Sequence, residues 1–291
     1  MKRVSVFLIA LLLVLPFYGC ATNEQYDVAA TTLPVYEFTT RLCQGASITV
    51  GRIVTQSVSC LHDYTLQVSQ MRAIQGAQVV VQSGAGLEEF LEDALDGAKT
   101  VIDASEGLSL HAGEHHTLDH DHGHVHEEDP HIWLSPENAK VMAQNICHGL
   151  TEQFPAHRDT FEENLQSLLA ELDTLQAYGA QKLASLSCRE LVTFHDGFSY
   201  FAESFDLTIL KAVEEESGSE ASAAELIALA NIVNEHQLPA VFTEVNGSVA
   251  AADILAAETG VKVYTLDMAM GGDSYFDAMY HNIDTIWEAL G

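Results

Sequence analysis

The stretch that decides the fold is residues 135–175, SPENAKVMAQNICHGLTEQFPAHRDTFEENLQSLLAELDTL. Ser135 is suited to cap a helix and Pro136 to fill its first position, where a backbone N–H is not needed. The helical pattern breaks near Phe154 and Pro155 and then resumes. Beyond the break, apolar residues recur on one helical face, at Phe161, Leu165, Leu168, Leu169, Leu172 and Leu175. The stripe is short for a coiled coil, so we expect one stiff helix buried against two flanking lobes.

On both sides of this helical region, β-rich runs alternate with helical patterns. Such alternation is typical of parallel strands joined by crossover helices. We therefore expect an α/β protein of two lobes, each with a mainly parallel sheet flanked by helices, at residues 20–135 and 187–291, with a helical linker at 136–186. The predicted strands are residues 27–32, 48–54, 77–82, 99–103, 190–194, 208–212, 240–243 and 261–266.

The N-terminus has the layout of a secretory signal. Lys2 and Arg3 precede an apolar run that ends at Leu15. This run is about a dozen residues long, short of the roughly 20 that a membrane-spanning helix needs. We expect residues 1–19 to be a signal peptide that is absent from the folded protein.

Cys20 directly follows Gly19, an arrangement that resembles the lipobox of bacterial lipoproteins. Phe17 and Tyr18 depart from the usual pattern. We expect lipidation of Cys20 and attachment to the outer face of the cell membrane, with plain secretion or a periplasmic location as the alternative.

The remaining cysteines are even in number, which is compatible with two disulfides in an oxidising compartment. Of the three possible pairings we favour Cys43 with Cys60 and Cys147 with Cys188, and buried free thiols are the alternative. No CxxC motif occurs, so the sequence indicates neither a zinc ribbon nor a redox pair.

The chain is strongly acidic, with 42 acidic residues against 12 basic ones and a formal net charge of −30. Nucleic acid and anionic membrane surfaces are both recognised by Lys and Arg, so this charge argues against them as partners. A cationic ligand fits better, although acidity also keeps an exported protein soluble. We expect a monomer.

Residues 111–126, HAGEHHTLDHDHGHVH, hold seven of the fourteen histidines and show no apolar periodicity. Tracts of this kind bind metals through composition and cannot supply a core. We expect a loop that collects metal weakly, with incidental affinity of a solvated insertion as the alternative. Its candidate auxiliary ligands are His111, His115, His116, His120, His122, His124 and His126.

Four side chains stand at or just beyond strand-like runs: His62, His131, His195 and Asp267. Ligands of open α/β sheets bind outside the carboxyl ends of strands, so two donors from each lobe could meet in the cleft. Three imidazoles and one carboxylate suit tetrahedral zinc. Spacing alone does not join positions so far apart along the chain.

A family resemblance assigns these four residues to one metal site. From about Tyr26 to its end the chain resembles the solute-binding proteins of zinc and manganese ABC importers, of the zinc-specific, high-affinity uptake type. The resemblance rests on these motifs, in order: LHDY, QMRAIQGAQVVVQSGAGLEEFL, DPHIWLSPENAKVMAQNI, LVTFHDGFSYFAESFDL, PAVFTEVNGSVAAADILAAETGVKVYTLD and YFDAMYHNIDTIWEAL. It implies metal ligands at His62, His131, His195 and Asp267, a rigid backbone helix between two lobes, and an ABC permease with its cytoplasmic ATPase as partners.

The third ligand, His195, indicates which metal the site prefers. Manganese members of the family usually carry a glutamate where His195 stands, and imidazole favours zinc over manganese. We expect Zn²⁺ as the transported ligand, with Mn²⁺ or Fe²⁺ as the alternative. Glu244, in VFTEVNG, is a candidate for orienting a ligand imidazole, and a simple surface or interlobe hydrogen bond is the alternative that we favour.

Two other function classes fit less well. The tract HDHGHVH superficially resembles the HxHxDH pattern of metallo-β-lactamase-like hydrolases, but the aspartate before its last histidine is missing. HExxH and GxSxG are also absent, and four protein ligands leave no open position for an activated water. Nothing resembles an interaction repeat, so a role as a surface adhesin is at most secondary. The sequence predicts metal capture for an importer and no enzymatic activity.

Overall fold

The computed structural model describes residues 26–56, 61, 64–95, 100–112, 128–214 and 221–291. Several predictions fall on residues outside these ranges and concern the signal peptide, Cys20, Cys60, His62 and the part of the histidine-rich tract at 113–127. Within the described part of the chain, no helix combines the length and apolar character needed to cross a bilayer.

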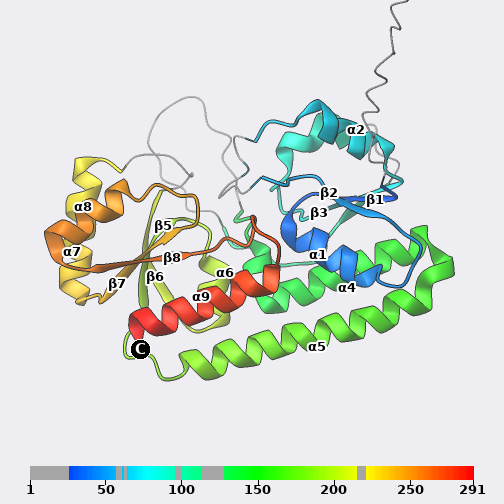
Figure 1. The fold of residues 1–291 in the computed structure, drawn as a ribbon. Coiled ribbons are helices and arrows are strands. Elements are labelled where there is room, and N and C mark those ends of the chain that lie inside the picture. The colour runs from blue at the N-terminus through cyan, green and yellow to red at the C-terminus, as the bar shows by residue number, and fades with distance from the viewer. Residues whose placement is uncertain (1–25, 57–60, 62–63, 96–99, 113–127, 215–220) are drawn as a thin grey trace, which may run out of the picture.

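The N-terminal lobe is built on a four-stranded sheet in the order β2-β1-β3-β4, and every neighbouring pair is parallel. Figure 1 shows this lobe beside a second one built on the same plan. The strands and helices of the first lobe are β1 (Val28–Ala30), α1 (Leu33–Leu42), β2 (Val50–Arg52), α2 (Val68–Gly76), β3 (Val79–Gln82), the 3-10 helix Glu89–Leu91, α3 (Glu92–Leu95) and β4 (Val101–Asp103).

The C-terminal lobe has a parallel sheet in the equivalent order β6-β5-β7-β8. Its elements are β5 (Glu190–His195), α6 (Ser199–Ser204), β6 (Thr208–Glu214), α7 (Ala223–His236), β7 (Ala240–Glu244), α8 (Ala250–Thr259), β8 (Lys262–Leu266) and α9 (Tyr275–Leu290). The eight predicted strands are therefore present with ends that differ by a few residues, and the prediction of two parallel-sheet lobes is confirmed.

The helical linker also follows the prediction. The 3-10 helix Ile132–Leu134 leads into α4 (Pro136–Gln153), whose first turn is capped by Ser135, with the Asn138 backbone N–H 3.4 Å from the Ser135 hydroxyl. Helix α4 ends at Phe154, and the 3-10 helix Pro155–His157 turns the chain into α5 (Arg158–Leu183).

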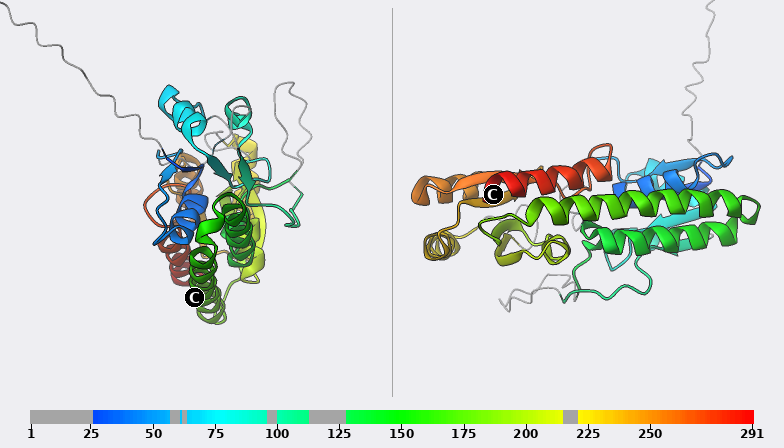
Figure 2. Two further views of the ribbon diagram at one scale, coloured as in Figure 1. Left: turned by 90° about the vertical axis from the view of Figure 1, so that its right-hand side faces the viewer. Right: turned by 90° about the horizontal axis from the view of Figure 1, so that it is seen from below.

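Helix α5 runs along both lobes, as Figures 1 and 2 show. It contacts α1 and α4 on one side and α9 of the C-terminal lobe on the other. Of the predicted stripe, Phe161, Leu168, Leu172 and Leu175 are buried and the other two leucines are half-buried. The prediction of burial against both lobes is confirmed.

The core follows from the alternation of side chains across each sheet. In β1, Val28 and Ala30 join a large cluster that continues through α4, α5 and α9, whereas Ala29 joins a smaller cluster on the opposite face. In β5, Leu191 belongs to the large cluster and Val192 to a separate one under α7 and α8. One shared core therefore fixes the two lobes against each other.

The favoured pairing of Cys147 with Cys188 is wrong, because both residues are free thiols. Cys147 is buried in α4, where it packs with the N-terminal lobe, and Cys188 lies just before β5 of the other lobe. The favoured pairing of Cys43 with Cys60 is also wrong, because Cys43, buried at the end of α1, is a free thiol. Cys60 itself lies outside the described residues.

Candidate metal centre

Two of the four candidate ligands meet between the lobes. His195 is the last residue of β5, and His131 stands directly before the 3-10 helix Ile132–Leu134. Their Nε2 atoms are 3.4 Å apart and their rings are nearly perpendicular, at 89°. Both side chains are buried, with exposed fractions of 4% and 1%. Two nitrogen donors thus converge at one buried point.

The orientation of His131 is set by Asp129. The Asp129 Oδ1 atom lies 2.8 Å from His131 Nδ1 and accepts the His131 backbone N–H at 2.9 Å. Nδ1 therefore carries the proton and Nε2 is left with its lone pair facing His195, which is the tautomer that a metal requires. The Ser199 hydroxyl of α6 donates to the other carboxylate oxygen of Asp129.

The charge of Asp129 is stabilised where it lies. Burial by itself raises the pKa of this carboxyl, but hydrogen bonds from His131 and Ser199 outweigh that effect and leave the pKa below its usual range. An ionised Asp129 makes the His131 imidazole a stronger donor toward a cation. Asp129 was missed in the sequence, although its place two residues before a candidate ligand could have indicated it.

Gly197 leaves room for the imidazole pair. A Cβ atom at this position would lie 2.9 Å from His195 Cδ2, 3.1 Å from His131 Cε1 and 2.6 Å from the Met268 methyl group. Both rings pack against the bare Cα, so any larger residue must displace them.

We expect Gly197→Ala to weaken zinc binding about tenfold, because overpacking of this size costs about 1–3 kcal/mol. Gly149→Ala is the matched control, because it introduces a clash of the same size at another site. Gly149 lies in α4, and a Cβ there would lie 2.6 Å from the Ile102 side chain. Competition against a fluorescent chelator measures both affinities. If the two variants lose zinc affinity equally, or if neither does, the packing at Gly197 has no special role.

Asp267 directly follows β8, and its backbone is held on both sides by Asn282 of α9. The Asp267 N–H donates to Asn282 Oδ1 at 2.7 Å, and Asn282 Nδ2 donates to the Asp267 carbonyl at 2.7 Å. The Asp267 Oδ1 atom accepts the backbone N–H of Ala269 at 2.8 Å. Ala269 is buried with φ of 55°, in the left-handed region that costs a non-glycine residue energy. The carboxylate helps to hold this tight turn.

The turn after Asp267 reaches the imidazole pair. Trp133, two residues after His131, donates its Nε1–H to the Met268 carbonyl at 2.7 Å, and its own carbonyl accepts the Tyr275 hydroxyl at 2.9 Å. Met268 in turn faces Gly197. Among the described residues, no three His, Cys, Asp or Glu side chains already form a metal cage. The structure brings His131 and His195 together, keeps Asp267 in the adjoining turn, and does not describe His62.

Glu244, the predicted partner of a ligand imidazole, ends β7, the strand next to β5. It is buried, with its carboxylate packed over Gly247, where a Cβ would lie 2.3 Å from Oε1. Its role toward an imidazole stays a prediction.

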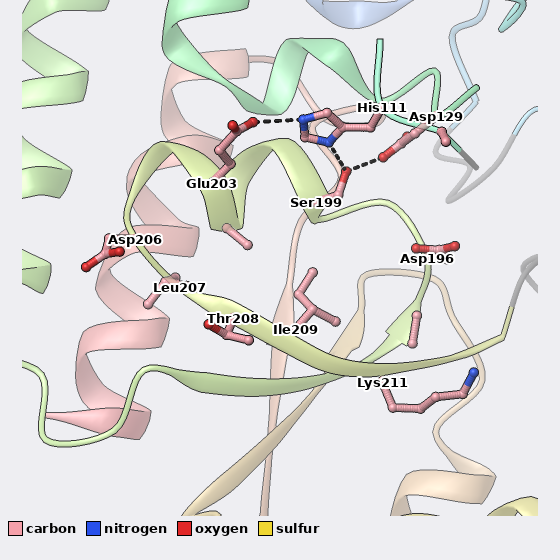
Figure 3. A pocket seen from close by; sticks show the side chains of 13 residues that line it. His111, Asp129, Asp196, Ser199, Glu203, Asp206, Leu207, Thr208, Ile209 and Lys211 are labelled. Carbon is pink, nitrogen blue, oxygen red and sulfur yellow. Dashed lines mark hydrogen bonds and ion pairs between the residues drawn. The ribbon is translucent and has the colours of Figure 1, made fainter. Parts of the chain in front are cut away.

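His111, at the start of the histidine-rich tract, lies beside the same network. Its Nδ1 is 3.2 Å from the Ser199 hydroxyl and its Nε2 is 2.8 Å from Glu203 (Figure 3). The ring also stacks on Tyr200 at a centroid distance of 4.1 Å. His111, Ser199 and Glu203 border a pocket of about 560 Å³ that Asp129 and Asp196 also line. The other six histidines of the tract are outside the described residues.

A second buried carboxylate lies at the carboxyl ends of β1 and β3. Glu88 accepts the Thr31 hydroxyl at 2.6 Å and the backbone N–H groups of Ser83 and Gly84 at 2.7 and 3.0 Å. Burial raises the pKa of Glu88 to about 7, although these hydrogen bonds act in the opposite direction.

This pKa predicts a pH dependence of stability. The folded chain keeps the Glu88 proton up to about pH 7, whereas the ordinary value is 4.5, so the free energy of unfolding should fall as the pH rises through that window. We expect a Glu88 contribution on the order of 1–2 kcal/mol between pH 5 and 7. Urea unfolding of the metal-free protein and of Glu88→Gln measures it, with the exposed Glu89→Gln as the charge-matched control. Parallel pH profiles for all three would show that Glu88 is ionised throughout.

Two parallel-sheet lobes packed along one long helix, with a pair of buried imidazoles between them, are the architecture of a two-lobed solute-binding protein. The chain belongs to the ZnuA family, zinc-uptake complex component A periplasmic, which it matches over residues 28–289. This is a family of metal-binding transport proteins and not a class of enzymes.

Named relatives agree with this placement. The chain is 29% identical to the zinc-binding lipoprotein AdcA of Streptococcus pneumoniae, over 98% of this chain and 60% of that protein. It is 29% identical to the high-affinity zinc uptake system protein ZnuA of Bacillus subtilis, over 92% of this chain and 88% of the relative. A crystal structure of ZnuA superimposes with a TM-score of 0.79 at 29% identity, covering 91% of this chain and 99% of that one. The chain thus spans only about three fifths of the streptococcal relative.

Proposed function

We propose that this protein captures Zn²⁺ outside the cytoplasm and delivers it to an ABC importer. The observation that carries the proposal is the convergence of His131 and His195 Nε2 atoms at 3.4 Å in a buried site between the lobes. Two imidazole nitrogens suit a borderline-soft cation such as zinc better than they suit manganese. The names of the relatives, a zinc-binding lipoprotein and a zinc uptake protein, support the same ligand.

The ligand set that we propose is His62, His131, His195 and Asp267, two from each lobe. In support, His131 presents Nε2 toward His195, and Asp267 begins the turn whose next residue, Met268, faces Gly197 beside both rings. A closed set of four protein ligands captures a metal without leaving the open position that hydrolysis would use. Capture depends on neutral imidazoles, so it should weaken below about pH 6 as they take up protons.

The proposal also covers the location of the protein and its partner proteins. We infer an extracytoplasmic chain held to the outer face of the membrane by lipid on Cys20, which the name of the streptococcal lipoprotein supports. Its partners are an ABC permease and the attached ATPase, and it works as a monomer. The acidic charge of −30 favours attraction of cations and repulsion of nucleic acid.

The experiment that tests this proposal is metal competition on the purified mature protein. Zinc, manganese and iron compete under chelator buffering, and we expect zinc to win by orders of magnitude. A preference for manganese would reassign the transported metal, and no tight site for any of the three would remove the transport function. The same assay on a deletion of residues 113–127 tests the tract, because unchanged zinc stoichiometry and uptake would leave it without a role in capture.

A further inference from the structure

Arg52, the last residue of β2, reaches from the N-terminal lobe to the turn that follows β8. Its Nη1 atom donates to the Gly272 carbonyl at 2.8 Å and its Nη2 atom to the Met270 carbonyl at 2.7 Å. Both acceptors belong to residues 267–274, which we name the Asp267 loop. A single arginine thus joins the first lobe to the segment that carries a proposed ligand.

Among the described residues, the guanidinium forms its hydrogen bonds across the lobe boundary. Burial lowers the pKa of Arg52, yet a guanidinium keeps its proton in proteins, so a partly desolvated cation lies here. Within the described residues its Nε is buried and has no hydrogen-bond partner. Every hydrogen bond described for this side chain therefore goes to the Asp267 loop. A cation whose described hydrogen bonds all cross to the other lobe contributes to the contact between lobes more than to the stability of its own sheet.

The Asp267 loop is held from two directions. Asn282 of α9 fixes the backbone of Asp267 within the C-terminal lobe, whereas Arg52 and Trp133 fix the following carbonyls from the first lobe. Ala269, in its left-handed conformation, lies between Met268 and Met270, whose carbonyls are held by Trp133 and Arg52. Loss of the first-lobe anchors would leave this turn free to relax and to carry the Asp267 carboxylate away from the imidazole pair.

We propose that Arg52 is a positioning residue that keeps the Asp267 loop closed over the captured metal and so controls metal release. The inference rests on the proposed function. Hydrogen bonds from a charged donor to a carbonyl are stronger than neutral ones, and both must break before the loop can move away. They oppose movement of the loop away from the site, so their loss should appear mainly in the dissociation rate and much less in the association rate.

The test measures zinc release from the loaded protein into excess chelator by stopped flow, together with the rate of zinc uptake. We expect Arg52→Gln to release zinc about ten- to a hundredfold faster, with the uptake rate changed less than about threefold. Arg52→Lys keeps the charge but cannot reach both carbonyls in a fork, so its release rate should be intermediate. It also serves as the second variant if Arg52→Gln does not fold.

Arg189→Gln is the matched control. The Arg189 guanidinium also donates to backbone carbonyls, those of Leu183, Phe205 and Asp206, but away from the Asp267 loop. This variant should lose stability and keep the wild-type release rate. If Arg52→Gln releases zinc at the wild-type rate, or if Arg189→Gln accelerates release equally, the positioning role is overturned. If the wild-type protein itself holds no zinc, the proposed function fails, which is a separate result.

Discussion

We expect His131→Ala and His195→Ala each to weaken zinc binding at least about a hundredfold, which corresponds to about 2.7 kcal/mol. The reason is geometric, because each residue places its Nε2 atom at the one buried point where the other also arrives. No described histidine is positioned to take its place. Affinities come from competition with a chelator of known zinc affinity, at neutral pH where imidazoles are unprotonated.

His236→Ala is the control for these two variants. Its imidazole is also bonded to a carboxylate, with Nδ1 3.0 Å from Glu190 Oε2, but it lies on the outer end of α7. Zinc affinity should be unchanged in this variant. If His195→Ala keeps affinity within about threefold of the wild type, the convergence of the two rings has no part in binding and the ligand set must be redrawn.

The fold was predictable because each of its elements has a local signal. β-rich runs gave eight strands, and Ser135 with Pro136 placed the start of α4. The stripe from Phe161 to Leu175 predicted burial on two lobes because one apolar face must be covered along its whole length. Parallel sheets follow from strands separated by helices, since a parallel connection needs a crossover.

Pairing between distant positions was not predictable from local signals. Proximity in sequence favoured Cys43 with Cys60 and left Cys147 with Cys188, but Cys43, Cys147 and Cys188 are free thiols. Cys147 lies in α4 and Cys188 precedes β5 of the other lobe, and a disulfide forms only between residues whose Cα atoms are close in space. Arg52 and Met270 are 218 positions apart, and nothing in either segment indicates their hydrogen bond. His131 and His195, 64 positions apart, were joined by family resemblance and not by spacing.

Asp129→Asn should weaken zinc binding about ten- to a hundredfold, the usual cost of removing a carboxylate that orients a metal-binding histidine. The asparagine fits the same space but carries no charge, so the His131 imidazole becomes a poorer donor. It can also turn its amide toward Nδ1, which favours the tautomer whose Nε2 bears the proton and cannot bind metal.

Asp103→Asn is the matched control for this variant, because Asp103 Oδ1 accepts the backbone N–H and the hydroxyl of Ser105 at 2.8 and 2.7 Å in a similar turn away from the imidazole pair. Both variants lose a buried charge-assisted hydrogen bond, and urea unfolding should show comparable losses of stability. Only Asp129→Asn should lose zinc affinity. Ser199→Ala, which removes the donor to the second oxygen of Asp129, should fall between the wild type and Asp129→Asn. Equal zinc affinity in Asp129→Asn and Asp103→Asn would mean that His131 keeps its tautomer without help from the Asp129 carboxylate.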